Sequence, residues 1–329
     1  MIRRLPPRLD VGEKVPSPLT GRATTVVYSI ACRDLVKAYR EKLQVDIAPY
    51  LGGISHLHLH RCPDSGFRFY QPSSVIGDDV FYKALSAHDW YYPGKKWEFE
   101  ESLRFVPAQG SLLEIGPGQG DFLQLCRTRF PKLRGIGLEL NRQAAASARS
   151  RGLDVREEDV AVHVDRAAGA YDAVCAFQVL EHIPDPLGFL QACCRLLRPG
   201  GRLLLAVPHN PEGGYDPLFA PLDDPLNLPP HHQGIWNADA LIFLSRILPL
   251  RLLHLGWETV QDQAQLDLYA RHVRAEFKAR HGSVSGRLRF FLGKTNLRTA
   301  LRSLAPFLPA HSLMAVFDKD SVGDRRNLP

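Results

Sequence analysis

The stretch SLLEIGPGQGDFL, residues 111–123, decides the fold class of this chain. An apolar run ends in a glycine-rich turn that leads directly into a helical pattern, which is how a strand–turn–helix unit begins. Gly116, Gly118 and Gly120 let the backbone turn sharply and let a ligand lie against it. We interpret this turn as the ligand-binding loop of an α/β domain.

Strand and helix patterns alternate on both sides of this loop. We predict strands at 111–116, 133–140, 171–177 and 202–208, a strand and loop at 153–159, and a last strand at 312–319. Helices are predicted at 120–130, 141–152 and 185–201, with further helical stretches beyond residue 236. Strands that alternate with helices of ten or more residues imply βαβ units and a doubly wound, parallel sheet.

Acidic residues around the loop indicate the kind of ligand. Glu139 ends the next predicted strand, 19 residues after Gly120, where a carboxylate is placed to accept hydrogen bonds from a ribose diol. A dinucleotide-binding loop would have its third small residue at Asp121, and a carboxylate there would repel a pyrophosphate. Together with Glu114, these acids favour a cationic ligand without phosphate, and S-adenosylmethionine fits better than NAD.

Residues 111–208 resemble a class I S-adenosylmethionine-dependent methyltransferase. The motifs that carry the resemblance are LLEIGPGQGDFL, GIGLELN, the acidic loop REEDV, YDAVCAFQVLEHIPDP and LRPGGRLLLAVP. The resemblance implies a Rossmann-like, doubly wound, mostly parallel seven-stranded sheet, with an N-terminal appendage and a helical cap.

The resemblance also implies roles for individual residues. Glu114 and the backbone of the glycine loop would hold the methionine end of the cofactor, and Glu139 would hold the ribose. Asp159 would bind the adenine amino group, with Glu158 as the alternative.

Phe177 and Gln178 would face the methionine moiety and the methyl group. Glu181 and His182 would start the next helix, where capping and packing are the alternative to a catalytic role for His182.

The N-terminal region poses a question about metal binding. KVPSPLTGR and HRCPDSGFRFYQP resemble two Cys-Pro-x-Cys-Gly zinc knuckles, but the four ligand positions are occupied by Ser17, Thr20, Cys62 and Ser65. A zinc ribbon needs four thiolate or imidazole ligands, so we expect a degenerate ribbon without metal. The alternative is an ion held by Cys62 with His56, His58 or His60, which alternate along a predicted hairpin strand.

The acceptor side is predicted in a proline- and histidine-rich loop, residues 208–237. This loop resembles an N-x-P-P-H-H…W segment of bacterial methyltransferases that act on glycans or secondary metabolites. A histidine is a natural general base for an alcohol, so His231 and His232 are the candidates, with Tyr215 and His209 behind them. The alternative is a proline-stiffened lid whose histidines cap or pack.

Composition limits the remaining choices. We expect a degenerate ribbon-like and helical region at 1–106 and a methyltransferase domain at 107–329, with a basic cap at 262–308. Between Arg271 and Arg302 there are nine Lys/Arg residues and one acid. Such a basic segment favours binding of an anionic acceptor group or contact with a membrane surface. The alternative is that it forms the solvated face of helices. No apolar run is long enough to span a bilayer, no nucleic-acid-binding motif appears, and six scattered cysteines predict a cytoplasmic protein.

These observations predict an enzyme that transfers a methyl group from S-adenosylmethionine to a small-molecule or glycan acceptor, at oxygen. A protein or RNA methyltransferase is the first alternative, and it is disfavoured because no recognition module is visible. A non-catalytic scaffold with the same fold is the second. The sequence leaves the acceptor and the oligomeric state open.

Overall fold

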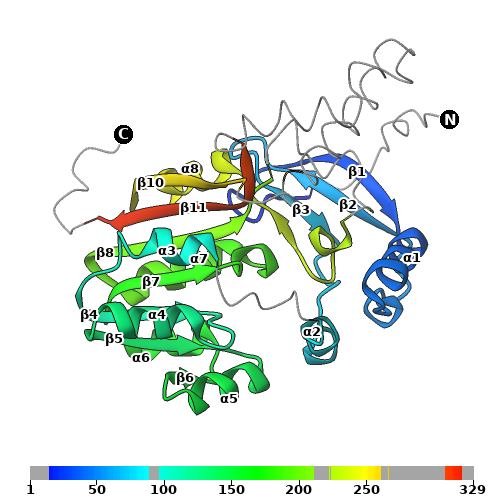
Figure 1. Cartoon of the computed structure of the whole chain (residues 1–329). Coiled ribbons are helices and arrows are strands. Elements are labelled where there is room, and N and C mark those ends of the chain that lie inside the picture. The colour runs from blue at the N-terminus through cyan, green and yellow to red at the C-terminus, as the bar shows by residue number, and fades with distance from the viewer. Residues whose placement is uncertain are drawn as a thin grey trace, which may run out of the picture. The chain divides into compact units, whose positions relative to one another are not determined.

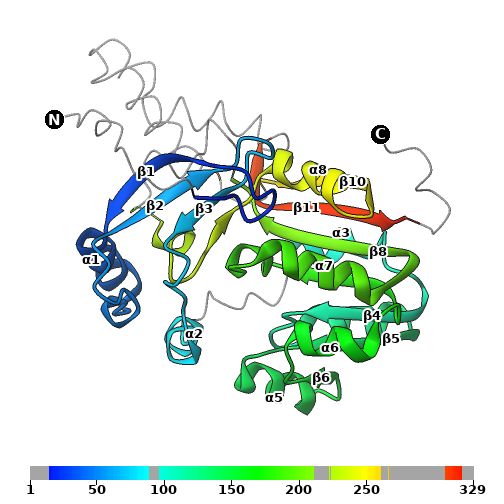
Figure 2. The same ribbon diagram turned by 180° about the vertical axis from the view of Figure 1, so that it is seen from behind.

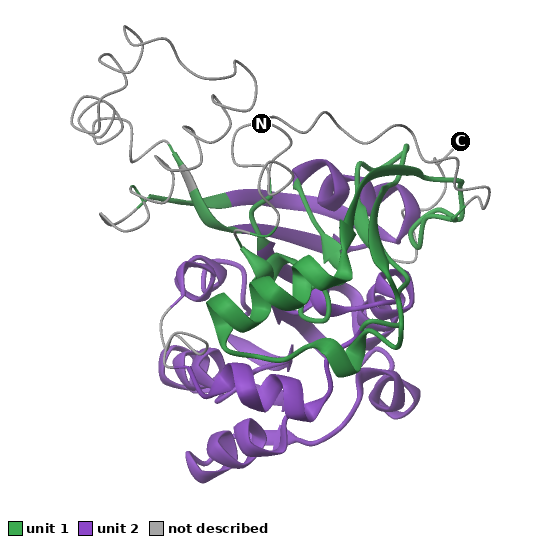
Figure 3. Ribbon diagram, turned by 90° about the vertical axis from the view of Figure 1, so that its right-hand side faces the viewer, with its two compact units in different colours: residues 1–75, 208–237, 257–312 green, residues 76–207, 238–256, 313–329 purple. Residues whose placement is uncertain are grey.

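The structure is a computed structural model, and it describes residues 15–88, 96–210, 222, 224–260, 266 and 308–320. The chain divides into two compact units, coloured separately in Figure 3. Unit 1 comprises residues 1–75, 208–237 and 257–312, and unit 2 comprises residues 76–207, 238–256 and 313–329. Each unit contains several segments of the chain, whereas the sequence analysis placed a single boundary between residues 106 and 107. The predicted domains stay a prediction.

A seven-stranded sheet forms the centre of unit 2, in the order β10-β11-β8-β7-β4-β5-β6 (Figure 1). Its strands are β4 (Gln109–Ile115), β5 (Lys132–Leu138), β6 (Asp154–Arg156), β7 (Tyr171–Phe177), β8 (Leu197–Pro208), β10 (Leu250–Thr259) and β11 (Pro309–Lys319). The pairs β4–β5, β4–β7, β5–β6 and β7–β8 are parallel. The predicted doubly wound, mostly parallel sheet is confirmed.

Helices cover both faces of this sheet. Helices α3 (Trp97–Ser102) and α4 (Asp121–Arg129) lie on the face seen in Figure 1, and α6 (Val160–Ala167) and α7 (Pro186–Leu196) lie on the face seen in Figure 2. Unit 2 also contains α2 (Asp79–Ser86), α5 (Arg142–Ser150), a 3₁₀ turn η2 (Leu180–His182) and α8 (Ala238–Ile247). Residues 173–176 of the central strand β7 are fully buried, as a strand covered on both faces must be.

Two elements of this sheet region differ from the prediction. Residues 250–259 form strand β10 rather than a helix, although α8 just before them is helical as expected. The short helix α6 was not predicted, because its three valines in six residues have low helix propensity. Its start is nevertheless encoded locally, since the Asp159 side chain accepts a hydrogen bond from the Ala161 N–H at 2.7 Å.

Unit 1 contains a four-stranded sheet in the order β1-β2-β3-β9. Its strands are β1 (Thr25–Ala31), β2 (His56–Arg61), β3 (Arg68–Gln71) and β9 (Gly234–Ile235), and helix α1 (Cys32–Leu43) and the 3₁₀ turns η1 (Ala48–Tyr50) and η5 (Pro225–Asn227) complete the unit. The predicted hairpin is present, with β2 and β3 paired antiparallel. The alternation along β2 buries Leu57 and Leu59 completely and leaves the histidines on the other face.

Among the described residues, no helix is both long enough and apolar enough to cross a membrane. The predicted basic cap at 262–308 lies outside the described residues, apart from residues 266 and 308.

Candidate cofactor site

The glycine loop joins β4 to α4, and its backbone conformation favours glycine. Gly116, Gly118 and Gly120 all have positive φ, at 69°, 55° and 83°. A Cβ on Gly120 would lie 2.4 Å from Cδ1 of Leu153, and one on Gly116 would lie 2.6 Å from Cγ2 of Val179. At Gly116 and Gly120, a side chain is therefore disfavoured by both backbone conformation and packing.

Glu139 is fastened to this loop. Its Oε2 accepts a hydrogen bond from the Gly118 N–H at 2.8 Å, and its Oε1 accepts one from the Asn141 N–H at 2.8 Å. Burial raises the pKa of Glu139, and the backbone donors partly offset that shift. Each carboxylate oxygen has a second lone pair, so Glu139 can also accept hydrogen bonds from a diol. The structure thus brings together the loop and the acid that the sequence predicted.

Glu114 is the buried acid of the site. It lies on β4 with 2 % of its surface exposed, and its Oε2 has no hydrogen-bond partner in the described parts of the chain. Burial raises its pKa to about 8, Glu139 and Asp121 add to this rise, and Lys96 opposes it. A buried carboxyl that lacks a partner is costly unless a donor or a cation meets it. The ammonium group of S-adenosylmethionine supplies both, so the residues present fit this cofactor.

Asp121, which the sequence argument used against a pyrophosphate, is paired. Its Oδ1 lies 2.7 Å from Nη1 of Arg151, which also donates to the Gln119 carbonyl. The arginine offsets part of the negative charge of Asp121. The preference for a cation therefore depends more on Glu114 and Glu139 than on Asp121.

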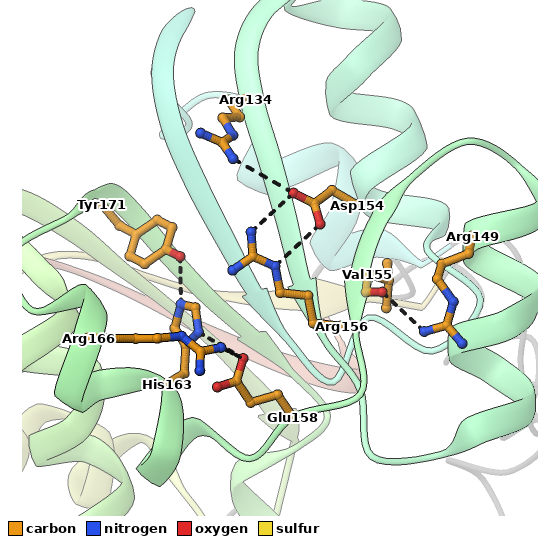
Figure 4. Close-up of polar contacts among 9 residues, drawn as sticks. All are labelled: Arg134, Arg149, Asp154, Val155, Arg156, Glu158, His163, Arg166 and Tyr171. Atoms are coloured by element: carbon orange, nitrogen blue, oxygen red, sulfur yellow. Dashed lines mark hydrogen bonds and ion pairs between the residues drawn. The ribbon is translucent and has the colours of Figure 1, made fainter.

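The two candidates for the adenine amino group have different surroundings, and Figure 4 shows those of Glu158. Asp159 is exposed and caps α6. Glu158 accepts on Oε2 from Arg166 and contacts Nδ1 of His163 at 3.2 Å, while its buried Oε1 has no partner among the described residues. Nε2 of the buried His163 lies 2.7 Å from the Tyr171 hydroxyl. Both acids therefore stay candidates, and the network that holds Glu158 was not predicted.

The end of β7 holds Phe177 and Gln178. Phe177 is buried and its ring packs on those of Phe99 and Phe122, at 5.8 and 4.9 Å between centroids. Gln178 has a φ of 56°, which is unusual for a residue with a side chain. Backbone conformations of this kind are found often at functional sites. Its Nε2 donates to Oε1 of the buried Glu98 at 3.1 Å. Glu98 lies 80 residues earlier in the chain, and no local sequence signal marks it.

Glu181 and His182 do not start the following helix, so that prediction is wrong. Both lie in η2, and α7 begins at Pro186 with Asp185 as its N-cap. Burial raises the pKa of Glu181 to about 8. Nε2 of His182 lies 3.9 Å from Oε1 of Glu181, and its Nδ1 lies 3.4 Å from the Tyr82 hydroxyl. The start of α7 is encoded separately, because the Asp185 side chain accepts a hydrogen bond from the Gly188 N–H and Pro186 is the first residue of the helix.

In unit 1, His231 and His232 form a stacked pair, with ring centroids 4.4 Å apart. Nδ1 of His231 lies 2.9 Å from the Leu226 carbonyl, and Nδ1 of His232 lies 3.1 Å from Oδ1 of Asn227. A carbonyl oxygen only accepts, so Nδ1 carries the proton and Nε2 is the basic nitrogen of each neutral ring.

Of the two reserve candidates, His209 lies in unit 1 and burial lowers its pKa to about 4. Tyr215 lies outside the described residues.

The four positions of the predicted zinc knuckles also come together in unit 1. Sγ of the buried Cys62 lies 3.6 Å from Oγ1 of Thr20. Burial would raise the pKa of the Cys62 thiol, but hydrogen bonds with Ser17, Ser65 and Thr20 lower it overall. Hydroxyl groups thus take the positions where thiolates would surround a metal.

Two histidines of β2 contact hydroxyl groups instead of Cys62. Nδ1 of His58 contacts Oγ of Ser29 at 2.7 Å, and Nδ1 of His60 contacts Oγ1 of Thr24 at 3.0 Å. These contacts support the expectation that the hairpin binds no metal, which stays a prediction.

Elemental analysis tests this expectation. Purified protein should contain well under one zinc per chain, because three of the four ligand positions carry hydroxyls, which rarely bind zinc. A stoichiometric zinc content that is lost in Cys62→Ser but kept in the control Cys32→Ser would contradict it.

The fold and the loop together define a class of protein. A parallel sheet with a glycine turn after its first strand and an acid at the end of the second is the arrangement of class I S-adenosylmethionine-dependent methyltransferases. Residues 98–283, more than half of the chain, match the family described as "Methyltransferase domain". The chain belongs to this family.

Curated relatives match over part of their length. The chain is 34% identical over 110 residues to a ubiquinone biosynthesis O-methyltransferase of Xanthomonas axonopodis pv. citri, covering 32% of this chain and 46% of the relative. It is 30% identical over 103 residues to the protein of the same name from Sodalis glossinidius, covering 30% and 41%. The chain thus spans less than half the length of these relatives.

Among solved structures, a S-adenosylmethionine-dependent methyltransferase from Archaeoglobus fulgidus superposes with a TM-score of 0.46 at 18% identity, covering 67% of this chain and 92% of that one.

Proposed function

We propose that this protein transfers a methyl group from S-adenosylmethionine to a hydroxyl oxygen of a small-molecule acceptor. The observation that carries the proposal is the buried, unpartnered carboxyl of Glu114 beside a glycine loop that Glu139 holds in place. This arrangement suits a ligand with a positive charge and a ribose. When bound, S-adenosylmethionine supplies an electrophilic methyl group on a positively charged sulfur.

The residues of the chain have separate tasks in this reaction. Glu114 binds the ammonium group, Glu139 binds the ribose hydroxyls, and Glu158 or Asp159 accepts from the adenine amino group. Phe177 and Gln178 line the methionine end. The N–H groups of the three loop glycines already have acceptors, because Gly118 donates to Glu139 and Gly116 and Gly120 donate to backbone carbonyls.

Deprotonation of the acceptor falls to His231 or His232. In the neutral tautomer that their Nδ1 contacts favour, Nε2 takes the hydroxyl proton as the oxygen–carbon bond forms and the carbon–sulfur bond breaks. The products are the methyl ether, S-adenosylhomocysteine and one proton.

Support for oxygen as the acceptor atom comes from the curated relatives, which are named O-methyltransferases. A glycan hydroxyl is the second acceptor class, because the loop 208–237 resembles that of methyltransferases that act on glycans. An anionic group on the acceptor, which the basic segment 271–302 would attract, stays a prediction.

Transfer of a ¹³C-labelled methyl group tests the proposal. The protein and labelled S-adenosylmethionine are incubated with cell extract that has been separated into small-molecule, glycan, protein and RNA fractions. We expect the label in the small-molecule fraction, with the ¹³C chemical shift of a methyl ether. Label in the protein or RNA fraction, or on nitrogen or carbon, would contradict the proposal. Cofactor binding without transfer to any fraction would support a scaffold instead.

A further inference from the structure

Three buried glutamates lie close to the carboxyl ends of β4 and β7 in unit 2. Glu98 is 1 %, Glu114 2 % and Glu181 2 % exposed. Strand β4 pairs with β7 so that Glu114 is opposite Cys175, and Glu181 follows the end of β7 by four residues. Only Glu114 was predicted to contact the cofactor, so the other two need an explanation.

The side chain of Glu98 has a hydrogen-bond partner, whereas one carboxyl oxygen of Glu181 has none among the described residues. Glu98 accepts a hydrogen bond from the side chain of Gln178, whose backbone has a positive φ. Oε2 of Glu181 is buried and has no hydrogen-bond partner within the described ranges. A buried carboxyl oxygen without a hydrogen-bond partner destabilises the fold, and a bound group that meets it would offset this cost.

Among the described residues, the charged or titratable groups that face Glu181 are Lys96, Glu98 and His182. Burial is the main cause of its raised pKa of about 8; among the neighbouring charges, Lys96 lowers this pKa and Glu98 raises it. His182 contacts its Oε1 at 3.9 Å. Lys96 also lowers the pKa of Glu114, so one ammonium group acts on both carboxyls. Glu114 further faces Glu139, Asp121, Cys126 and Cys175.

The reaction changes the charge that these carboxyls would meet. S-adenosylmethionine carries an ammonium and a sulfonium, whereas S-adenosylhomocysteine has lost the sulfonium charge. Glu114 is assigned to the ammonium, and Glu181 follows Phe177 and Gln178, the pair assigned to the methyl end.

We propose that Glu181 distinguishes cofactor from product by ionising when the sulfonium is bound and by taking up a proton when it is replaced by a neutral thioether. This inference rests on the proposed function. The exchange favours release of the product, because the protonated carboxyl has no charge with which to attract the neutral thioether of S-adenosylhomocysteine.

The pH dependence follows from the direction of the shift. Free protein holds its proton on Glu181 below about pH 8. Binding of a cation favours the ionised form, so binding releases a proton and affinity rises with pH up to that value. A ligand with neutral sulfur leaves the proton on Glu181, so its affinity should depend less on pH.

Titration calorimetry in two buffers of different ionisation enthalpy measures the protons released. At pH 7 we expect S-adenosylmethionine to release about one proton more than S-adenosylhomocysteine. Sinefungin, in which an amine-bearing carbon replaces the sulfonium, should behave like S-adenosylmethionine because its amine is charged.

Glu181→Gln keeps the shape of the side chain but cannot ionise. It should remove the difference in proton release and lower the preference for S-adenosylmethionine over S-adenosylhomocysteine by about tenfold. Glu101→Gln is the matched control, because Glu101 lies on α3 with Glu98 but forms ion pairs with Arg104 and His254, and it should keep the wild-type difference.

Equal proton release for cofactor and product in the wild-type protein would overturn the inference, and so would a difference that persists in Glu181→Gln. If Glu181→Gln does not fold, the three wild-type titrations decide. Failure of the proposed function looks different, because S-adenosylmethionine would then either not bind or bind without transfer of its labelled methyl group to a hydroxyl oxygen.

Discussion

Replacement of both His231 and His232 by alanine should reduce turnover by about 10²–10⁴-fold while S-adenosylmethionine binds as before. The loss is expected because the two rings offer Nε2 as their basic nitrogen, and removing both leaves no base from this pair. Single variants should lose less, since the rings are stacked neighbours in the same loop. Steady-state kinetics and calorimetry on the same preparations measure the two effects.

Both histidines are buried, so a structural effect must be separated from a chemical one. The double variant His231→Asn, His232→Asn retains side-chain N–H donors for the Leu226 carbonyl and the Asn227 amide. It should unfold near the wild-type temperature and still be inactive. His56→Ala is the control in the same unit, because His56 is exposed on β2 and should be silent. Turnover that survives in the double asparagine variant would exclude the pair as the base.

Glu139→Ala should weaken binding of S-adenosylmethionine by ~1–3 kcal/mol. The variant removes the acceptor for the ribose hydroxyls and also frees the Gly118 and Asn141 N–H groups that Glu139 now engages. Glu139→Gln keeps one acceptor oxygen and should have an intermediate affinity. Calorimetry measures both.

Glu157→Ala is the matched control for Glu139→Ala. Glu157 lies in the loop after the neighbouring strand β6, but it forms a partly exposed ion pair with Arg142. Its removal should leave cofactor affinity within error of wild type. Unchanged affinity in Glu139→Ala, with the thermal unfolding temperature also unchanged, would refute the assignment of the ribose acid.

The cofactor loop and Glu139 were predictable because their signals are local. A strand end, a glycine pattern and an acid at the end of the next strand are all read within 26 residues of sequence, from Glu114 to Glu139. The parallel sheet then places the two strand ends side by side. The same holds for the hairpin at β2 and β3, which local alternation predicts.

Contacts between distant parts of the chain were not predictable. Glu98 meets Gln178 across 80 residues, and Lys96 influences Glu114 and Glu181 from outside the motif region. Strand β10 was taken for helix because its leucine-rich sequence suits either state, and its place at the sheet edge is set by tertiary pairing.

The N-terminal knuckles show an intermediate case. Their resemblance to a zinc ribbon predicted which four positions would converge, and the structure brings Ser17, Thr20 and Ser65 to Cys62. The sequence did not reveal that their hydroxyls would lower the pKa of the thiol, because that effect depends on the closed geometry.

Parallel calorimetric titrations with S-adenosylmethionine and NAD⁺ test the central idea most directly, namely that acids around the glycine loop select a phosphate-free cation. S-adenosylmethionine should bind to one site per chain, and NAD⁺ should give no heat of binding at the same concentrations. Binding of NAD⁺ that S-adenosylmethionine cannot displace would contradict the account.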